Sequence, residues 1–340
     1  MPTAHQVTLR PSGRVFPIEE GQDILAAAFA AGIKLRHSCR VGHCRACIGR
    51  IAAGDFDPGP TAERQLTSEA RDKGFALLCR AMARSDLEIE AREVAMLAGP
   101  QTVPAYVKSV EKLTDDIARL TLRLPPSASM TFMAGQHVDF LLPDGRRRSY
   151  SIANAADPGG SVNLEFHIRH QPGGAFSDTV FTAMKAKDRI TLEGPLGTFF
   201  LQEEGARRVF LCTGTGYAPI RAMILQALAK GDEQPMTLYC GMRAPAELYM
   251  LDEVRELAAR HGNLTVVPVV SRPAADGSWD GRTGYVQDAA LADLGSLADV
   301  TVYACGSPVM IAAAEGAFGA RGLPPARFYF GAFVNESADA

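Results

Sequence analysis

The spacing of four cysteines constrains this chain more than any other feature of its sequence. Cys39, Cys44 and Cys47 follow the pattern C-x4-C-x2-C, and Cys79 comes after a long gap. This spacing is typical of plant-type 2Fe–2S proteins, in which one tight loop presents three thiolates and a fourth arrives from elsewhere in the fold. A zinc site is the alternative, because Cys44 and Cys47 alone form a C-x-x-C pair. Structural zinc more often uses two separated pairs or pairs that include His, so the sequence predicts a 2Fe–2S cluster held by all four cysteines.

The composition narrows the class of protein further. The chain has 340 residues, which is enough for two or three domains of about 100–200 residues each. Its net charge is −3 and its Lys and Arg residues are scattered among acids, so we expect no nucleic-acid partner. Seven cysteines, an odd number, favour metal binding or redox chemistry over a disulfide framework.

The sequence carries no signal for a membrane. No stretch approaches the roughly 20 consecutive apolar residues that cross a bilayer. The first residues, Met1–Ala4, lack the basic and then apolar layout of a signal peptide. We therefore expect a cytoplasmic protein without a membrane partner, and a monomer is the default expectation.

The rhythm of apolar residues divides the chain into three predicted domains. Residues 1–96 combine short strands, a helix at Asp23–Ala31 and the cysteine loop, and a linker follows at residues 97–102. Residues 103–204 contain short alternating runs separated by turns, which predict an antiparallel barrel or sandwich. Residues 205–340 alternate apolar runs with helical segments, the β-α-β pattern of a parallel sheet.

Two motifs in the second domain are suited to a flavin nucleotide. Arg148-Ser149-Tyr150-Ser151 ends an apolar run, and in a strand Arg148 and Tyr150 face the same side. A guanidinium can clamp a phosphate, and an aromatic ring can stack on a flat heterocycle. Gly173-Gly174-Ala175-Phe176-Ser177 precedes a helical pattern, whose free N–H groups would attract a phosphate. A solvated basic turn is the alternative for the first motif taken alone.

The third domain carries motifs suited to a pyridine dinucleotide. Gly214-Thr215-Gly216-Tyr217-Ala218-Pro219 follows a predicted strand and opens a predicted helix, the context that a dinucleotide pyrophosphate requires. Cys212, Cys240 and Cys305 fall near the ends of predicted strands, at the sheet edge that holds ligands. Small core residues are the ordinary interpretation of such cysteines, and we keep it for Cys212 and Cys240.

Together these motifs resemble those of the ferredoxin–NAD(P)H reductase family whose members carry an N-terminal plant-type 2Fe–2S domain. The matching segments are Gly74–Cys79, the R-x-Y-S and G-G-x-F-S motifs, the G-T-G-x-A-P turn, and Cys305–Met310, which matches C-G-x-P-x-M. The resemblance covers essentially the whole chain. It implies a β-grasp ferredoxin domain, an antiparallel β-barrel that binds FAD, and a parallel α/β domain that binds NAD(P)H.

The resemblance also implies roles for individual residues. Arg148 would neutralise the flavin phosphate, Tyr150 would stack on the isoalloxazine, and Ser151 would bond near its N5. The residues implied around the pyrophosphate of FAD are His167, Ile168, Arg169, Gly173, Gly174 and Ser177. Those implied in binding the nicotinamide nucleotide are Gly214, Thr215, Gly216, Pro219, Arg243, Cys305 and Gly306, while Phe333 is implied to cover the flavin.

Three of these residues are predicted to be catalytic: Ser151, Cys305 near the reactive nicotinamide carbon, and Phe333 over the isoalloxazine. Gly331 stands where the family often has Asp or Glu, so a role for that acid is in doubt in this chain. Arg243 occurs also in members that use NADH, so NADH is the predicted donor and NADPH the alternative.

The predicted activity follows from the electron count of the three cofactors. NAD(P)H delivers two electrons together as hydride and a 2Fe–2S cluster accepts one at a time, so flavin stands between them. The predicted acceptor is the oxygenase component of an aromatic-ring hydroxylating (Rieske-type) dioxygenase. The alternatives are a di-iron monooxygenase, a CDP-deoxysugar dehydratase, and, from another class, an electron carrier that does not oxidise NAD(P)H.

Overall fold

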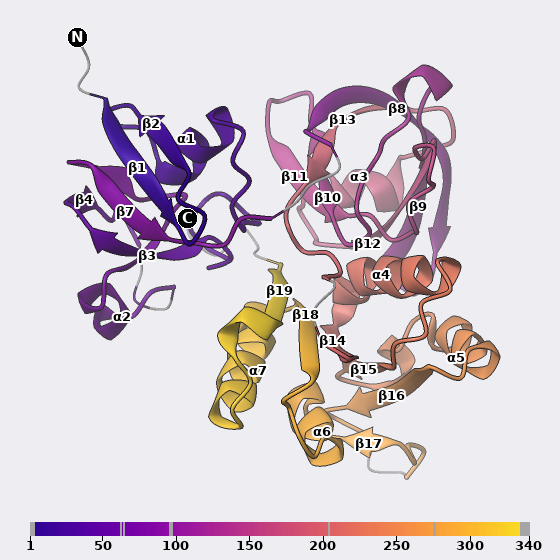
Figure 1. Cartoon of the computed structure of the whole chain (residues 1–340). Coiled ribbons are helices and arrows are strands. Elements are labelled where there is room, and N and C mark those ends of the chain that lie inside the picture. The colour runs from indigo at the N-terminus through magenta and orange to yellow at the C-terminus, as the bar shows by residue number, and fades with distance from the viewer. Residues whose placement is uncertain are drawn as a thin grey trace. The chain divides into compact units, whose positions relative to one another are not determined.

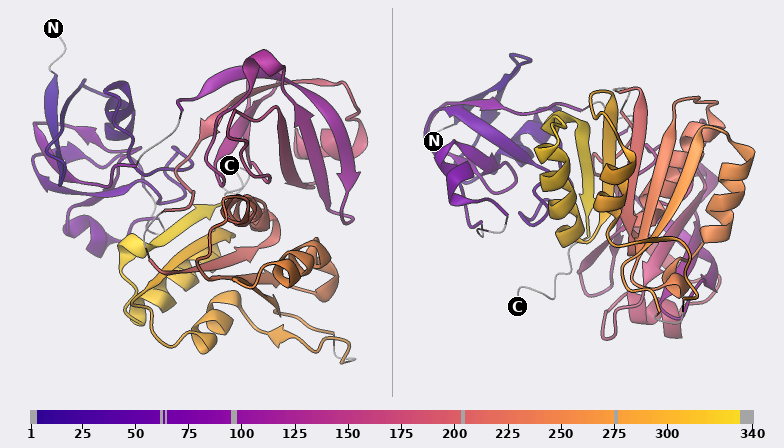
Figure 2. Two further views of the ribbon diagram at one scale, coloured as in Figure 1. Left: turned by 45° about the vertical axis from the view of Figure 1, so that its right-hand side comes forward. Right: turned by 90° about the horizontal axis from the view of Figure 1, so that it is seen from below.

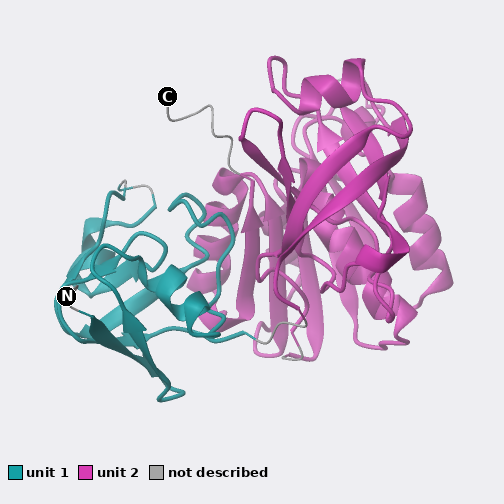
Figure 3. Cartoon of the chain, turned by 90° about the horizontal axis from the view of Figure 1, so that it is seen from above, with its two compact units in different colours: residues 1–96, 334–340 teal, residues 97–333 magenta. Residues whose placement is uncertain are grey.

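The structure, a computed structural model, describes residues 4–61, 63, 65–94, 98–202, 205–274 and 277–333. Its contacts separate two units, residues 1–96 and residues 97–333, which Figure 3 colours teal and magenta. Among the described residues, every helix is too short or too polar to cross a membrane.

The first unit is built on a five-stranded sheet with the order β2-β1-β7-β3-β5 (Figure 1). A second, two-stranded sheet pairs β4 with β6. The strands of this unit are β1 (His5–Arg10), β2 (Val15–Ile18), β3 (Ile48–Ala53), β4 (Phe56–Asp57), β5 (Phe75–Leu77), β6 (Met82–Ala83) and β7 (Leu87–Glu90). The helices are α1 (Ile24–Ala30) and α2 (Ser68–Asp72).

Local sequence explains why these elements begin and end where they do. Gly13 adopts φ +73° in the turn between β1 and β2, a conformation that costs glycine little. Asp23 caps α1, because its side chain accepts a hydrogen bond of 2.8 Å from the Ala26 N–H. Alternate residues of β1, Val7 and Leu9, are fully buried, so one face of the sheet and α1 share a single core.

The second unit begins with a six-stranded antiparallel sheet of order β11-β10-β13-β8-β9-β12. Ala153, just beyond β11, donates its N–H to the Glu165 carbonyl on β12 (2.8 Å), so the two edge strands of this sheet meet and it curls into a barrel. The strands are β8 (Gln101–Lys112), β9 (Ile117–Arg123), β10 (His137–Leu141), β11 (Arg147–Ser151), β12 (Asn163–Arg169) and β13 (Arg189–Leu196). The helices are η1 (Pro126–Ala128) and α3 (Ser177–Thr182).

The start of β8 differs from the sequence expectation. Residues 97–102 were predicted as a linker, but β8 begins at Gln101, inside that stretch. Gln101 and Thr102 are already paired with Gly194 and Glu193 on β13. Cross-strand pairing therefore begins the strand two residues before Val103, where the apolar pattern placed the start of the domain.

The same unit continues into a six-stranded parallel sheet of order β17-β16-β15-β14-β18-β19, with helices on both faces (Figure 2). The strands are β14 (Arg207–Thr213), β15 (Met236–Met242), β16 (Leu264–Val270), β17 (Arg282–Thr283), β18 (Val300–Gly306) and β19 (Phe328–Ala332). The helices are η2 (Gly214–Gly216), α4 (Tyr217–Ala229), η3 (Pro245–Glu247), α5 (Leu251–Arg260), α6 (Val286–Asp293), α7 (Pro308–Ala320) and η4 (Pro325–Arg327).

The predicted fold class is confirmed: a ferredoxin-like α+β sheet, an antiparallel barrel and a parallel α/β sheet follow one another. The strand β17 and the helix α6 were not predicted. Their sequences are short and α6 is rich in Ala, so neither shows a clear apolar period.

Candidate functional site

The four predicted cluster ligands lie together in the first unit as two pairs of thiols. The backbone N–H of Cys39 donates to Cys44 Sγ, and that of Cys44 donates to Cys39 Sγ, each over 3.3 Å. The Cys47 and Cys79 sulfurs are 3.2 Å apart. The hydrogen bond from the Cys44 thiol lowers the pKa of Cys39 to about 5. The same hydrogen bond raises the pKa of Cys44, so one thiol of the pair gives up its proton more readily than the other. Because thiolates are the form that ligates metal, two thiols this close are suited to sharing a metal centre.

The loop that carries three of these thiols depends on left-handed backbone. Arg40, Gly42 and Arg45 adopt φ values of 57°, 85° and 64°. At Gly42 a Cβ would lie 2.9 Å from Cγ of Arg80, so a larger residue there would have to displace the Arg80 side chain. The loop is thereby folded tightly enough for backbone N–H groups to point at sulfur.

The arrangement distinguishes the two metals weighed from the sequence. Among the described residues, no three Cys, His, Asp or Glu side chains converge as they would on a single metal ion. Two adjacent pairs of thiols instead match a cluster of two irons, each held by one pair. The donor set therefore fits a 2Fe–2S cluster better than a mononuclear zinc ion.

The predicted flavin strand is β11, and its side chains alternate as expected. Arg147 and Ser149 face Asp139, with contacts of 3.4 and 2.6 Å, so Arg148 and Tyr150 lie on the other side of the strand. The Tyr150 ring packs edge-on against Phe140, with 5.3 Å between ring centroids. Burial raises the pKa of Tyr150 to about 12, so its hydroxyl stays protonated.

The predicted pyrophosphate loop is a tight turn before α3. Ser177 Oγ accepts from the Gln171 N–H (3.0 Å) and donates to the Gln171 carbonyl (3.1 Å). A Cβ on Gly174 would lie 2.6 Å from Ser177 Oγ, and Gly173 adopts φ +79°. Glycine at both positions lets the backbone approach a phosphate, which fits the predicted binding role.

The residues predicted beside this loop point in different directions. Ile168 is fully buried in the barrel core, so only its backbone is available to a cofactor. His167 is buried as well, with Nδ1 3.1 Å from the Tyr249 hydroxyl and Nε2 3.1 Å from Glu165 Oε1. Burial lowers the pKa of His167, so it is neutral near pH 7. Arg169 reaches toward the parallel sheet, where its Nη1 lies 3.5 Å from the Cβ position of Gly214.

The glycine turn and the Cys305 loop meet at the carboxyl edge of the parallel sheet. A Cβ on Gly216 would lie 2.2 Å from the Cys305 carbonyl oxygen, and one on Gly306 would lie 2.2 Å from Thr213 Oγ1. Such close approach excludes any side chain at either glycine. Thr215 lies in the same turn, and Pro219 is buried in the first turn of α4. Burial raises the pKa of Cys305, so its thiol is neutral.

The last described residues close over this edge. β19 pairs with β18 in parallel, and the Phe333 N–H donates to the Gly306 carbonyl (3.0 Å). Phe333 is 37% exposed, unlike the buried aromatic residues Phe328, Tyr329 and Phe330 before it. Cys305, Gly306 and Phe333 thus lie together, as expected from the sequence.

Arg243 lies apart from this group, just beyond the end of β15. Its N–H contacts Glu247 Oε2 (3.3 Å), and its carbonyl accepts from the Arg272 N–H (2.7 Å). Both arginine side chains are exposed, and the described structure gives neither an ion pair. The sequence analysis did not single out Arg272, which lies two residues beyond the end of β16.

A second group that sequence reasoning missed links the barrel to the parallel sheet. Arg221 on α4 contacts Glu165 on β12 and Glu253 on α5. The sequence feature that could have indicated this contact is one charged residue, Arg221, within an apolar helical segment. Its neighbours Ile220, Ala222, Met223 and Ile224 are all buried.

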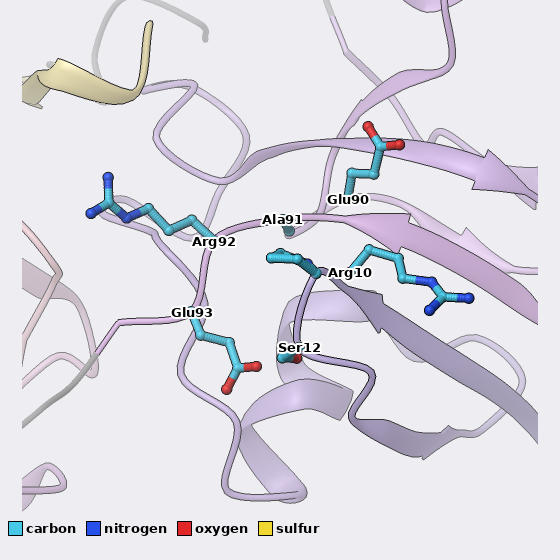
Figure 4. A pocket seen from close by; sticks show the side chains of 7 residues that line it. Arg10, Ser12, Glu90, Ala91, Arg92 and Glu93 are labelled. Atoms are coloured by element: carbon cyan, nitrogen blue, oxygen red, sulfur yellow. The ribbon is translucent and has the colours of Figure 1, made fainter.

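The first unit also carries a shallow groove (Figure 4). It is lined by Arg10, Pro11, Ser12, Glu90, Ala91, Arg92 and Glu93. Ion pairs with Glu88, Arg50 and Arg14 already engage Arg10, Glu90 and Glu93. None of the predicted site residues lines this groove, so we do not assign a cofactor to it.

Comparison with known proteins defines the class. Residues 7–84 match the 2Fe-2S iron-sulfur cluster binding domain, residues 104–201 the oxidoreductase FAD-binding domain, and residues 210–316 the oxidoreductase NAD-binding domain. The protein is an NAD(P)H-dependent flavin iron–sulfur oxidoreductase that passes electrons from NAD(P)H through FAD to a 2Fe–2S cluster.

The similarity extends along the whole chain. The CDP-6-deoxy-L-threo-D-glycero-4-hexulose-3-dehydrase reductase of Yersinia pestis is 40% identical, over 96% of this chain and 98% of the relative. The ferredoxin–NAD(P)(+) reductase component of the naphthalene 1,2-dioxygenase system of Pseudomonas putida is 32% identical, over 96% and 98%. The crystal structure of the Amycolatopsis cytochrome P450 reductase GcoB has a TM-score of 0.77 and 32% identity, over 97% and 99%. The chain belongs to the family of ferredoxin–NAD(P)H reductases with an N-terminal plant-type 2Fe–2S domain, and its acceptor is a protein.

Proposed function

We propose that this reductase supplies electrons to a separate dehydrase that acts on a CDP-linked deoxysugar. The observation that carries this proposal is the 40% identity to the Yersinia pestis dehydrase reductase along 96% of the chain. The sequence analysis named this acceptor as an alternative. It becomes the leading candidate because the dehydrase reductase is 40% identical to this chain, whereas the naphthalene dioxygenase reductase component is 32% identical.

The oxygenase component of a ring-hydroxylating dioxygenase is the second candidate. The sequence analysis favoured it, and the 32% identity to the naphthalene 1,2-dioxygenase reductase component supports it. The electron-transfer path inside the reductase is the same for either acceptor.

The residues of this chain have separate tasks in that path. Cys39, Cys44, Cys47 and Cys79 would hold the cluster through the two thiol pairs. Bound FAD would supply the chemistry that converts a hydride from the nicotinamide into single electrons for the cluster. Tyr150 would stack on the isoalloxazine ring of the flavin. The turn at Gly214 and the neutral thiol of Cys305 would position the nicotinamide. Proximity accounts for most of what the protein contributes to hydride transfer.

The choice of pyridine nucleotide rests on Arg243 and Arg272. The sequence favours NADH, because family members that use it also carry Arg at the first position. The backbone contact between the two residues lies just beyond the carboxyl ends of β15 and β16, the edge at which open α/β sheets bind ligands, and both arginines are exposed. Arginine there favours the 2′-phosphate of NADP. We therefore propose that the enzyme accepts NADPH as well as NADH. A cytoplasmic location and a monomeric state stay predictions.

The test is NAD(P)H-driven reduction of purified acceptors under anaerobic conditions. A CDP-deoxysugar dehydrase and a Rieske oxygenase component are compared at equal concentration. Faster reduction of the dehydrase supports the proposal, and faster reduction of the oxygenase component favours the second candidate. The variant Cys44→Ser is the control, because reduction through the cluster must disappear in it.

A further inference from the structure

One arginine joins the two cofactor-binding parts of the second unit. Arg221 lies on α4, with its side chain 11% exposed. Its Nη1 donates to the Ala153 carbonyl (2.8 Å) and lies 3.2 Å from Glu165 Oε1. Its Nε donates to Glu253 Oε1 (2.6 Å). One guanidinium thus holds three acceptors from different elements.

The acceptors of Arg221 lie next to the predicted flavin site. Ala153 is two residues beyond Ser151, the end of β11, and its N–H is bonded to the Glu165 carbonyl. Glu165 also contacts the buried His167 (3.1 Å). The arginine therefore fixes the chain segment that follows the flavin strand.

The helix that carries Arg221 begins at the predicted nucleotide turn. α4 starts at Tyr217, directly after the turn Gly214–Gly216, and can be followed in Figure 1 beside β12. A second contact lies farther along the helix, where Gln226 Oε1 accepts from the Ala156 N–H (2.7 Å). Both contacts hold α4 against residues 153–156.

The chemistry of the contact requires arginine in particular. A planar guanidinium with five N–H donors can serve a carbonyl and two carboxylates at once, whereas an ammonium is a point charge on a flexible stem. Without Arg221, the carboxylate of Glu165 would lose its cationic partner. Its side chain is only 18% exposed and lies beside the fully buried side chain of His167. Loss of one partner in a buried ion pair is costly and drives rearrangement of the groups around it.

We propose that Arg221 is a positioning residue for hydride transfer, which sets the distance between the nicotinamide held by the turn before α4 and the flavin held by β11. The proposal rests on the assignment of those two sites made above. Hydride transfer depends steeply on that distance, because a misplacement of about 1 Å can cost about a hundredfold in rate. The substrate itself need not touch Arg221.

The test compares Arg221→Gln with Arg221→Lys and with a matched control. The control is Arg208→Gln, which removes a similarly buried arginine from β14 of the parallel sheet, where it is paired with Asp232 (2.6 Å). Each variant is loaded with FAD and its flavin content is measured. Anaerobic stopped-flow mixing with NADH and with NADPH then gives the limiting rate of flavin reduction, the nucleotide Kd and the nicotinamide–flavin charge-transfer absorbance.

The proposal predicts that Arg221→Gln lowers the limiting rate per bound flavin by at least about tenfold. The charge-transfer absorbance should weaken while the nucleotide Kd changes much less. Arg221→Lys should recover part of the rate, and Arg208→Gln should keep it even where its Tm falls.

An Arg221→Gln rate per flavin equal to that of the wild type would overturn the proposal. Glu165→Gln, a milder change that removes the ion pair between Arg221 and β12, tests the same point if Arg221→Gln does not fold. Its limiting rate should fall by less than that of a folded Arg221 variant, and an unchanged rate with an unchanged charge-transfer absorbance would overturn the proposal. Failure of wild-type flavin to react with either nucleotide would instead refute the assigned activity.

Discussion

Cys305 and Gly331 lie opposite each other in the parallel pairing of β18 with β19, and a Cβ on Gly331 would be 3.3 Å from the Cys305 sulfur. The same Cβ would be 3.2 Å from Cδ1 of Phe199. In the family this position often carries an acid. Here the space that an acid would need is narrowed by a thiol and an aromatic ring, which explains why glycine fits.

A branched residue at position 331 should therefore destabilise the protein. Overpacking of a filled core costs about 1–3 kcal/mol, so we expect Gly331→Val to lower the Tm by several degrees. Cys305→Ala should restore part of that loss, because it removes the sulfur that the new side chain meets. A thermal melt of both single variants and the double variant measures the coupling. Purely additive effects would show that the contact is not the cause.

The Cys305 thiol should matter for hydride transfer without acting as a base. Burial raises its pKa, so the neutral thiol persists to higher pH than the usual value of about 8.5. We expect Cys305→Ala to slow flavin reduction, while the wild-type rate shows no step from this thiol between about pH 6 and pH 9. Cys240→Ala, at a buried position on β15, which is separated from β18 by β14, is the control and should keep the rate. A pH-dependent change in the wild-type rate that is absent from Cys305→Ala would show that the thiol titrates in this range, which would contradict the prediction that it stays neutral.

Arg272 should affect NADPH more than NADH. An ionic hydrogen bond to a phosphate contributes about 1.5–3 kcal/mol, so Arg272→Ala should lower kcat/KM for NADPH by roughly tenfold or more and leave NADH nearly unchanged. Steady-state kinetics with both nucleotides measure this. Arg260→Ala, an exposed arginine at the end of α5, is the control. Equal loss with both nucleotides would mean that Arg272 does not contact the 2′-phosphate.

The cysteine ligands and the glycine turns could be predicted because their chemistry is local in sequence. Three cluster cysteines lie within one loop, and the fourth follows a short strand, so spacing alone indicated the site. Gly214–Gly216 lies between a strand and a helix, and the structure keeps this order. The fold class could be predicted for the same reason, since each domain has its own apolar period.

Contacts between distant segments could not be predicted. Arg221 and Ala153 are 68 positions apart, and nothing in either segment indicates that they meet. Ile168 was expected near a cofactor from the family resemblance, but alternation along β12 turns its side chain into the barrel core. The narrow space beside Gly331 depends on Phe199, which comes from another part of the chain.

The central claim is that electrons leave the flavin only through the cluster. Anaerobic mixing of Cys44→Ser with NADH or NADPH tests it most directly, with flavin bleaching and reduction of a one-electron protein acceptor followed in the same experiment. The account predicts bleaching at the wild-type rate and no reduction of the acceptor beyond the rate without enzyme. Equal loss of both steps, or acceptor reduction at the wild-type rate, would contradict it.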